Sequence, residues 1–174
     1  MSRPARNWLL VALVVVVGVA VAPRLPDALV WALAGVALVV MVAALIVTAD
    51  FRAARALFAK KQFDDAAVRL AGFEKSLASP WRARLAGLAV GVYTSNALAA
   101  ARNTLGAVRL EQGKFDEAQA HFDAALKLDA QYALPWANKA LLAKQRGEDF
   151  SEARNRAVAL GAKAKALDAL LGAA

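Results

Sequence analysis

The strongest constraint on this chain is residues 28–49, a stretch of 22 residues without a charged side chain. As an α-helix it would measure about 33 Å, enough to cross the roughly 30 Å hydrocarbon core of a bilayer. A shorter uncharged stretch, residues 8–22, comes before it, and the five residues between them include two prolines. We therefore expect an antiparallel transmembrane hairpin over residues 1–50, with helices at about residues 8–25 and 28–49.

Two alternatives compete with the hairpin. Arg3 and Arg6 before the first apolar stretch, with Ala-Val-Ala at residues 20–22, are also typical of a secretory signal peptide. Pro23 would follow the cleavage point, where we expect it to hinder the peptidase. The second stretch is open to a further interpretation as a buried helix of a soluble protein, but 22 uncharged residues are long for that role.

Basic residues near the ends of the two stretches predict the orientation. Residues 1–7 carry two arginines, the connection carries one, and the segment after the second stretch carries four basic residues, which are Arg52, Arg55, Lys60 and Lys61. Because lysine and arginine concentrate on the cytoplasmic side, both termini are expected in the cytoplasm. The same four residues are also candidates for contact with anionic lipid headgroups.

A second pattern occupies residues 105–128. A helical segment ends at Gly113, a residue type that readily takes the left-handed conformation found at helix ends. A second segment then places apolar residues along one helical stripe. These residues are Phe115, Ala118, Phe122, Ala125 and Leu126. Glycine, aromatic and alanine return together 34 to 35 positions later, at Gly147, Phe150 and Ala153.

This pattern resembles the tetratricopeptide repeat, a 34-residue helix-turn-helix unit with Leu-Gly in its first helix and Ala-x3-Phe in its second. Leu105-Gly106 and Ala118 with Phe122 match those positions. Residues 63–73 repeat the spacing of the second helix, without a glycine at the preceding turn. The resemblance implies an all-α chain in which residues 51–174 form a short solenoid of about three units. The expected units are residues 51–80, 97–130 and 133–161, with a capping helix at 162–172.

Residues 81–96 fit neither pattern. Phe63 and Phe115 are 52 positions apart, which is 18 more than one repeat, so we expect an inserted or extended helix between the first two units. Two placements remain open for it. The helix either packs into the core or lies on the bilayer surface, with Trp81 and Leu88 among the residues that face inward.

The composition and motifs argue against catalysis. The chain has no cysteine, its single histidine is His121, and no glycine-rich phosphate loop occurs. We therefore expect no enzyme activity, no metal and no cofactor. Residues 51–174 carry a net charge of +7, but their basic residues are scattered and are not interleaved with aromatics. Nucleic-acid binding is therefore not expected.

The resemblance implies instead a groove, built by the first helices of the units, that binds a protein or peptide. Carried over by position, the groove residues are Asn103, Ala107, Leu110, Glu111, Leu134, Ala137, Asn138, Leu141, Lys144 and Gln145. The expected function is a membrane-anchored scaffold or adaptor at the cytoplasmic face of a bacterial-type inner membrane. The alternative is a small accessory or assembly subunit of a larger membrane complex, in which the hairpin makes the main contacts.

Overall fold

The computed structural model describes residues 12–13, 16, 26–90 and 94–172, and within these ranges the chain forms α-helices and no β-strand. The all-α fold class is thereby confirmed for the described part of the chain. The first apolar stretch, and with it the hairpin, lies outside the described residues except at positions 12, 13 and 16. The helices are α2 (Asp27–Val47), α3 (Ala49–Ala59), α4 (Phe63–Ser76), α5 (Pro80–Val90), α6 (Ala97–Glu111), α7 (Phe115–Leu128), α8 (Ala133–Arg146), α9 (Ser151–Ala159) and α10 (Ala164–Leu171).

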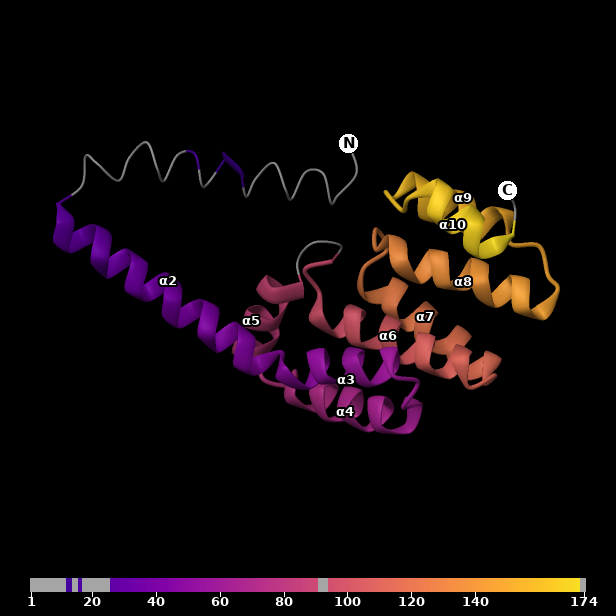
Figure 1. Ribbon diagram of the computed structural model, residues 1–174, viewed down its shortest axis with the longest axis horizontal. Coiled ribbons are helices and arrows are strands. Elements are labelled where there is room, and N and C mark those ends of the chain that lie inside the picture. Colours follow the sequence, from indigo (N-terminus) through magenta and orange to yellow (C-terminus); the bar gives the residue numbers. More distant parts are fainter. Residues whose placement is uncertain (1–11, 14–15, 17–25, 91–93, 173–174) are drawn as a thin grey trace.

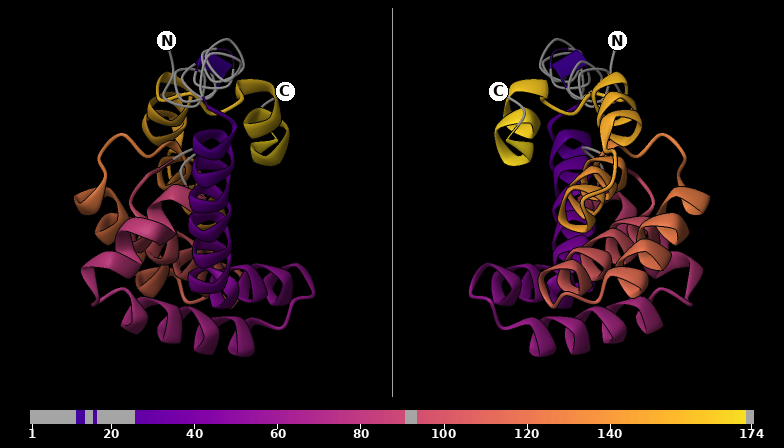
Figure 2. Two further views of the ribbon diagram at one scale, coloured as in Figure 1. Left: turned by 90° about the vertical axis from the view of Figure 1, so that its left-hand side faces the viewer. Right: turned by 90° about the vertical axis from the view of Figure 1, so that its right-hand side faces the viewer.

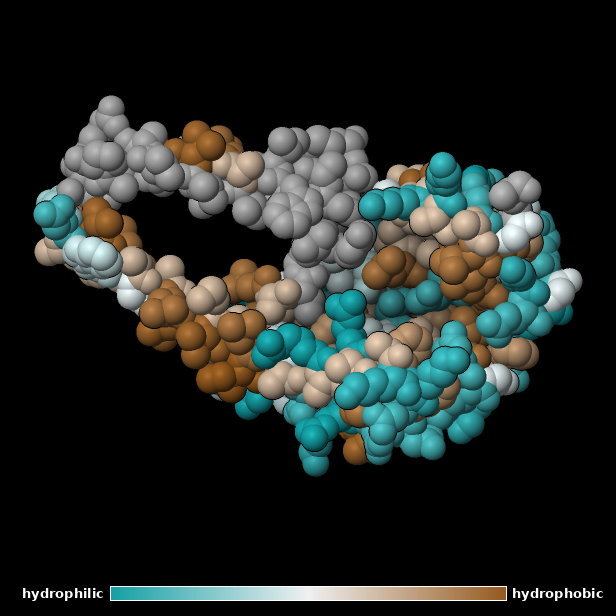
Figure 3. Space-filling view, viewed as in Figure 1, coloured by the Kyte–Doolittle hydropathy of each residue, from teal (hydrophilic) through white to brown (hydrophobic). Residues whose placement is uncertain are grey.

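Helix α2 extends away from the other labelled helices (Figure 1). Of the described helices, it is the one long and apolar enough to cross a membrane. Only 11% of its most apolar stretch is buried, whereas the core helix of a soluble protein is mostly covered. Its buried residues are Ala44 and Val47, both near its C-terminal end. Hydrophobic residues therefore dominate the surface of α2, whereas hydrophilic and hydrophobic residues are mixed on the surface of the helices beyond it (Figure 3).

The junction between α2 and α3 is a single residue, Thr48. Helix α2 ends at Val47, two residues earlier than the expected position 49. The Thr48 hydroxyl donates a hydrogen bond of 2.8 Å to the carbonyl oxygen of Ala44. The guanidinium of Arg52 in α3 donates a 2.8 Å hydrogen bond to the carbonyl of Leu45. This bond satisfies one of the carbonyls that a helix leaves free in its last turn, and places positive charge at the negative end of the helix dipole.

Beyond this junction the helices form three side-by-side pairs, which are α3 with α4, α6 with α7, and α8 with α9. The pairs also contact each other, through α4 against α6 and α7 against α8. Figure 2 shows the same succession from two sides. A pair of amphipathic helices cannot bury its own apolar face, so each pair completes its core against its neighbour.

The three pairs share one kind of turn. The first helix of each pair is followed by a residue in the left-handed conformation, and these residues are Lys61 (φ 60°), Gly113 (φ 73°) and Gly147 (φ 72°). In every case the next amide donates back across the last turn of the helix, which satisfies a carbonyl that would otherwise be free. The three bonds run from Gln62 to Leu57 (3.0 Å), from Lys114 to Arg109 (2.9 Å) and from Glu148 to Ala143 (2.9 Å).

The inserted segment forms α5, which packs against α2 on one side and α6 on the other. Ala86 and Gly87 are buried, and a Cβ atom at Gly87 would lie 2.4 Å from the backbone oxygen of Ser95. Trp81 and Leu88 remain 57% and 69% exposed. Helix α5 therefore combines one packed face with one exposed apolar face, and residues 91–93 of this segment lie outside the described ranges.

The C-terminal helix α10 covers the last pair. Leu167 and Leu171 of α10 are buried in one cluster with Ala140 of α8 and Ala157 of α9. Arg154 of α9 also forms an ion pair of 2.7 Å with Asp168 of α10. These contacts remove the open apolar edge that a stack of helix pairs leaves at its end.

Candidate functional site

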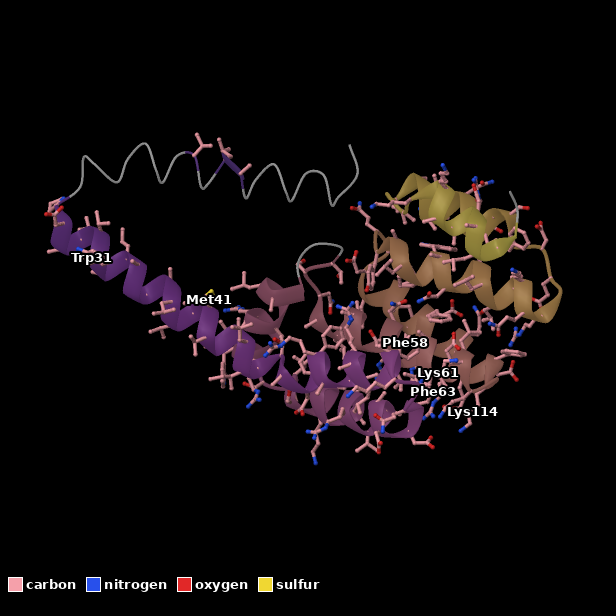
Figure 4. The ribbon with its side chains drawn as sticks, in the orientation of Figure 1. Trp31, Met41, Phe58, Lys61, Phe63 and Lys114 are labelled. Atoms are coloured by element: carbon pink, nitrogen blue, oxygen red, sulfur yellow. The ribbon has the colours of Figure 1, made fainter. Side chains whose placement is uncertain are left out.

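The four basic residues expected to contact lipid separate into two groups. Arg52 and Arg55 lie on the first turns of α3, next to the C-terminal end of α2. Lys60 and Lys61 lie at the opposite end of α3, where Lys61 occupies the turn beside Phe58 and Phe63 (Figure 4). Because α3 rises about 1.5 Å per residue, roughly 12 Å of helix separates Arg52 from Lys60.

Arg52 and Arg55 border a cavity of about 440 Å³ at the foot of α2. Its walls come from the end of α2, from α3, from the end of α5, from α6, and from the start of α8 with the residues that precede it. The lining residues are Leu45, Thr48, Phe51, Arg52, Arg55, Ala89, Thr94, Ala100, Thr104, Tyr132 and Leu134. The cavity thus joins segments that are far apart in the sequence, at the point where the apolar helix ends.

Local hydrogen bonds fix the wall of this cavity. Asn96 caps α6, since its side chain accepts a 3.0 Å hydrogen bond from the amide of Ala99. The hydroxyl of Thr94 donates a 2.7 Å hydrogen bond to the carboxylate of Asp129, which follows α7. The N-terminus of α6 is therefore tied to the end of α7, and the residues lining this side of the cavity are held in place.

The cavity is positively charged. Its lining contains two arginines and no carboxylate. Arg55 forms no hydrogen bond or ion pair with any other described residue, whereas several other arginines are each paired with a carboxylate. The pairs are Arg69–Asp50, Arg102–Glu74, Arg109–Glu117, Arg146–Asp116 and Arg154–Asp168.

The expected groove residues Asn103 and Asn138 bind each other. Asn138 Nδ2 of α8 donates a 2.9 Å hydrogen bond to Asn103 Oδ1 of α6, and Asn103 is buried. A buried amide that lacks a partner is costly, so this bond stabilises the contact between α6 and α8. In this arrangement the two side chains join the second and third helix pairs to each other.

Two of the three expected groove leucines contribute to the core. Leu110 is buried in a cluster with Phe122 and Leu142, and Leu141 packs against the same cluster. Their apolar side chains therefore hold neighbouring helices together. Of the remaining expected positions in this region, Ala107 is half-buried and Glu111 is exposed.

Lys144 and Gln145 are both exposed near the C-terminal end of α8. The Lys144 ammonium donates a 2.8 Å hydrogen bond to the carbonyl of Leu170 in α10. Lys144 therefore helps to hold the covering helix, while no such contact is seen for Gln145 among the described residues.

The cavity and the expected groove share helix faces. Along α6, the lining residues Ala100 and Thr104 and the groove residues Ala107 and Glu111 follow the i, i+4, i+7, i+11 spacing of one face. On α8, Leu134 and Gln145 are at positions i and i+11, so they also lie on one face of their helix. The cavity is therefore the end of the expected groove that lies nearest α2. Sequence patterns gave no signal for Ala100 or Thr104, which are small residues without distinctive chemistry.

The described residues contain no group of three or more histidine, aspartate, glutamate or cysteine side chains placed to hold a metal ion. His121 lies on α7, away from the cavity lining. Burial lowers the pKa of His121, and Arg102 and Arg109 lower it further, against Glu74 and Glu117. Comparison with protein-family models and with curated proteins finds no match to this chain.

Proposed function

We propose that this chain is a membrane-anchored scaffold of the tetratricopeptide-repeat type, which holds a protein partner beside the bilayer. The observation that carries the proposal is the direct junction at Thr48. A stack of three helix pairs, each with the same left-handed turn after its first helix, begins one residue after an exposed apolar helix. A groove built on such a stack has a fixed distance from the end of α2.

The proposed binding face is the part of the groove that remains accessible. Asn103, Leu110 and Leu141 are engaged in internal contacts, and Lys144 is bound to α10. The accessible positions are Ala107, Glu111 and Gln145 on the α6 and α8 faces that lead away from the cavity. We place this face in the cytoplasm, because of the excess of basic residues that flank the apolar stretches.

A second candidate function rests on the exposed surface of α2. Trp31 is 76% exposed, and a Cβ atom at Gly35 would meet no atom of another described element within 4 Å. Small residues at helical spacing, including Ala28 and Ala32, permit close contact with another transmembrane helix. This surface suits an accessory subunit whose main contacts lie in the membrane.

Site-specific photocrosslinking in the full-length, membrane-inserted chain separates the two functions. A photoreactive residue at Gln145 reports on the groove, one at Ala32 reports on α2, and one at Val68, which is exposed on α4, serves as the control. A scaffold gives one discrete product from Gln145 that is absent from Val68. An accessory subunit gives its discrete product from Ala32 alone, and that result would exclude the scaffold.

A further inference from the structure

We propose that the cavity at the foot of α2 binds the phosphate-bearing headgroup of an anionic membrane phospholipid. The inference rests on one part of the proposed function, namely that α2 spans the bilayer. In that case, the last turn of α2 lies at the level of the lipid headgroups. Leu45 and Thr48 from this turn line the cavity, so the cavity opens at that level.

The charge of the cavity suits a phosphate. Arg52 and Arg55 are three positions apart on α3, a spacing that places them on one face of the helix. Arg52 uses one N–H group on the carbonyl of Leu45, but a guanidinium has five. Arg55 has no partner among the described residues. Planar guanidinium groups bind phosphate through paired hydrogen bonds, and no lining carboxylate competes for them here.

The rest of the cavity suits the apolar part of a lipid. Phe51, Ala100 and Leu134 contribute to its lining. Leu45 also lies on one face of α2 with Met41 and Leu38, at helical spacing, and all three are exposed. Figure 4 shows Met41 on the exposed part of α2. An acyl chain that follows this face leads from the bilayer to the arginines of the cavity.

A bound lipid differs from a general attraction between basic residues and the membrane. All four basic residues near α2 would contribute to a diffuse attraction in proportion to charge, at about 1 kcal/mol each when they lie close to the surface. In the structure, Lys60 and Lys61 are not among the residues that line the cavity. The two lysines carry the same charge as the two arginines but follow the opposite end of α3, so they provide the control.

The test uses the full chain in nanodiscs that contain equal amounts of phosphatidylglycerol and phosphatidylcholine. After transfer to mild detergent, native mass spectrometry counts the lipids that stay bound. We expect the wild type to retain phosphatidylglycerol about tenfold over phosphatidylcholine, which corresponds to about 1.4 kcal/mol. Arg55→Gln and the double variant Arg52→Gln/Arg55→Gln should abolish this preference, whereas Lys60→Gln/Lys61→Gln should change it by less than about twofold.

A variant that leaves the charge intact tests the shape of the cavity. Thr104 is half-buried, and among the described residues its hydroxyl bonds only to the carbonyl of Ala100 in its own helix. Thr104→Phe should fill part of the cavity and reduce lipid retention to near that of Arg55→Gln. An equal loss in the lysine variant, or undiminished selectivity in both Arg55→Gln and Thr104→Phe, would overturn the proposal.

Alkaline carbonate extraction of membranes that contain the full-length chain distinguishes failure of the lipid site from failure of the proposed function. A chain that resists extraction and still crosslinks from Gln145, but shows no lipid selectivity, contradicts only the lipid site. A chain that carbonate releases from the membrane contradicts both proposals, because each requires α2 to span the bilayer.

Discussion

The first and second helix pairs place residues of different size at equivalent positions. Gly106 of α6 lies against Phe122 of α7, and a Cβ atom at Gly106 would come within 2.5 Å of the Phe122 ring. Fifty-two positions earlier, the equivalent residues are Ala54 and Leu70, which are also fully buried. A smaller residue on the first helix therefore accompanies a larger one on the second. Combined volume, rather than residue type, is what the close pairing of helices requires.

The third pair extends this comparison. Its equivalent positions are Ala140 and Ala157, two small residues that are fully buried. Leu167 and Leu171 of α10 complete the cluster around them. In the third pair, the two leucines of α10 fill the space that Phe122 fills in the second pair. This is consistent with the place of α10 at the end of the stack.

The largest expected effect comes from Phe122→Ala. The side chain is fully buried, and its neighbour Gly106 has no Cβ with which to fill the space left behind. We expect a loss of about 3–5 kcal/mol in the free energy of unfolding, measured by urea denaturation of the full chain in detergent. Leu70→Ala in the first pair removes a smaller side chain and should cost less. A larger loss for Leu70→Ala would contradict the tighter packing of the second pair.

Gly106→Ala tests the same contact from the other side. The new Cβ would meet two ring atoms of Phe122, at 2.5 and 2.7 Å, and a fully buried ring has little room to move. Overpacking costs about 1–3 kcal/mol and alanine gains about 1 kcal/mol in helix propensity, so we expect a net loss of up to about 2 kcal/mol.

Two further variants sharpen this result. Adding Phe122→Leu to Gly106→Ala reproduces the alanine and leucine of the first pair, and should recover most of the loss in the same denaturation experiment. Gly72→Ala in α4 is the matched control, because its Cβ would meet nothing within 4 Å. It should stabilise the chain by about 0.5–1 kcal/mol. If Phe122→Leu gave no recovery, the size complementarity of the two positions would be refuted.

A smaller effect is expected at the turns. Lys61 has a left-handed backbone (φ 60°) at the position where the second pair has Gly113. That conformation costs a residue with a Cβ atom about 1–2 kcal/mol, partly offset by the greater freedom of glycine in the unfolded chain. Lys61→Gly should therefore raise the free energy of unfolding by about 0.5–1 kcal/mol. Lys60→Gly, at the preceding position with φ −87°, should not stabilise the chain.

These comparisons show what the sequence specifies directly. The glycine turns at Gly113 and Gly147, together with the apolar stripes that follow them, predict α6 to α9 because each signal is local. The equivalent turn at Lys61 carries no glycine, so no local signal in the sequence predicts its left-handed backbone. The sequence predicts α5 only as an insertion, because one of its packing partners, α2, is separated from it in the sequence by α3 and α4.

The candidate site was predicted in part. Clustering of charge in the sequence identified Arg52, Arg55, Lys60 and Lys61, but only the folded chain separates the two that line the cavity from the two that do not. The cavity also needs Thr104, which no sequence motif distinguishes. Leu110 was expected in the groove, yet it packs into the core. A single sequence does not establish which face of a helix a neighbouring unit covers.

The smallest expected effect is a difference in acid sensitivity between the two pairs. His121 of α7 is equivalent to Arg69 of α4, which is exposed and pairs with Asp50 at 2.9 Å. Burial, with Arg102 and Arg109, lowers the pKa of His121 below its ordinary value of 6.5. The folded state therefore binds this proton less readily than the unfolded state, so the stabilising contribution is complete above about pH 6.5 and is lost as the pH falls through the lowered pKa. The first pair contains no histidine.

Hydrogen exchange measured between pH 7.5 and 5 should consequently show opening of α6 and α7 before α3 and α4. His121→Gln removes the titrating group and should abolish the difference between the two pairs, while leaving the exchange at pH 7.5 nearly unchanged. Selective opening of α6 and α7 that persisted in His121→Gln would assign the acid sensitivity to a carboxylate instead. Glu117 would then be the first residue to test, because it pairs with Arg109 at 2.9 Å beside the histidine.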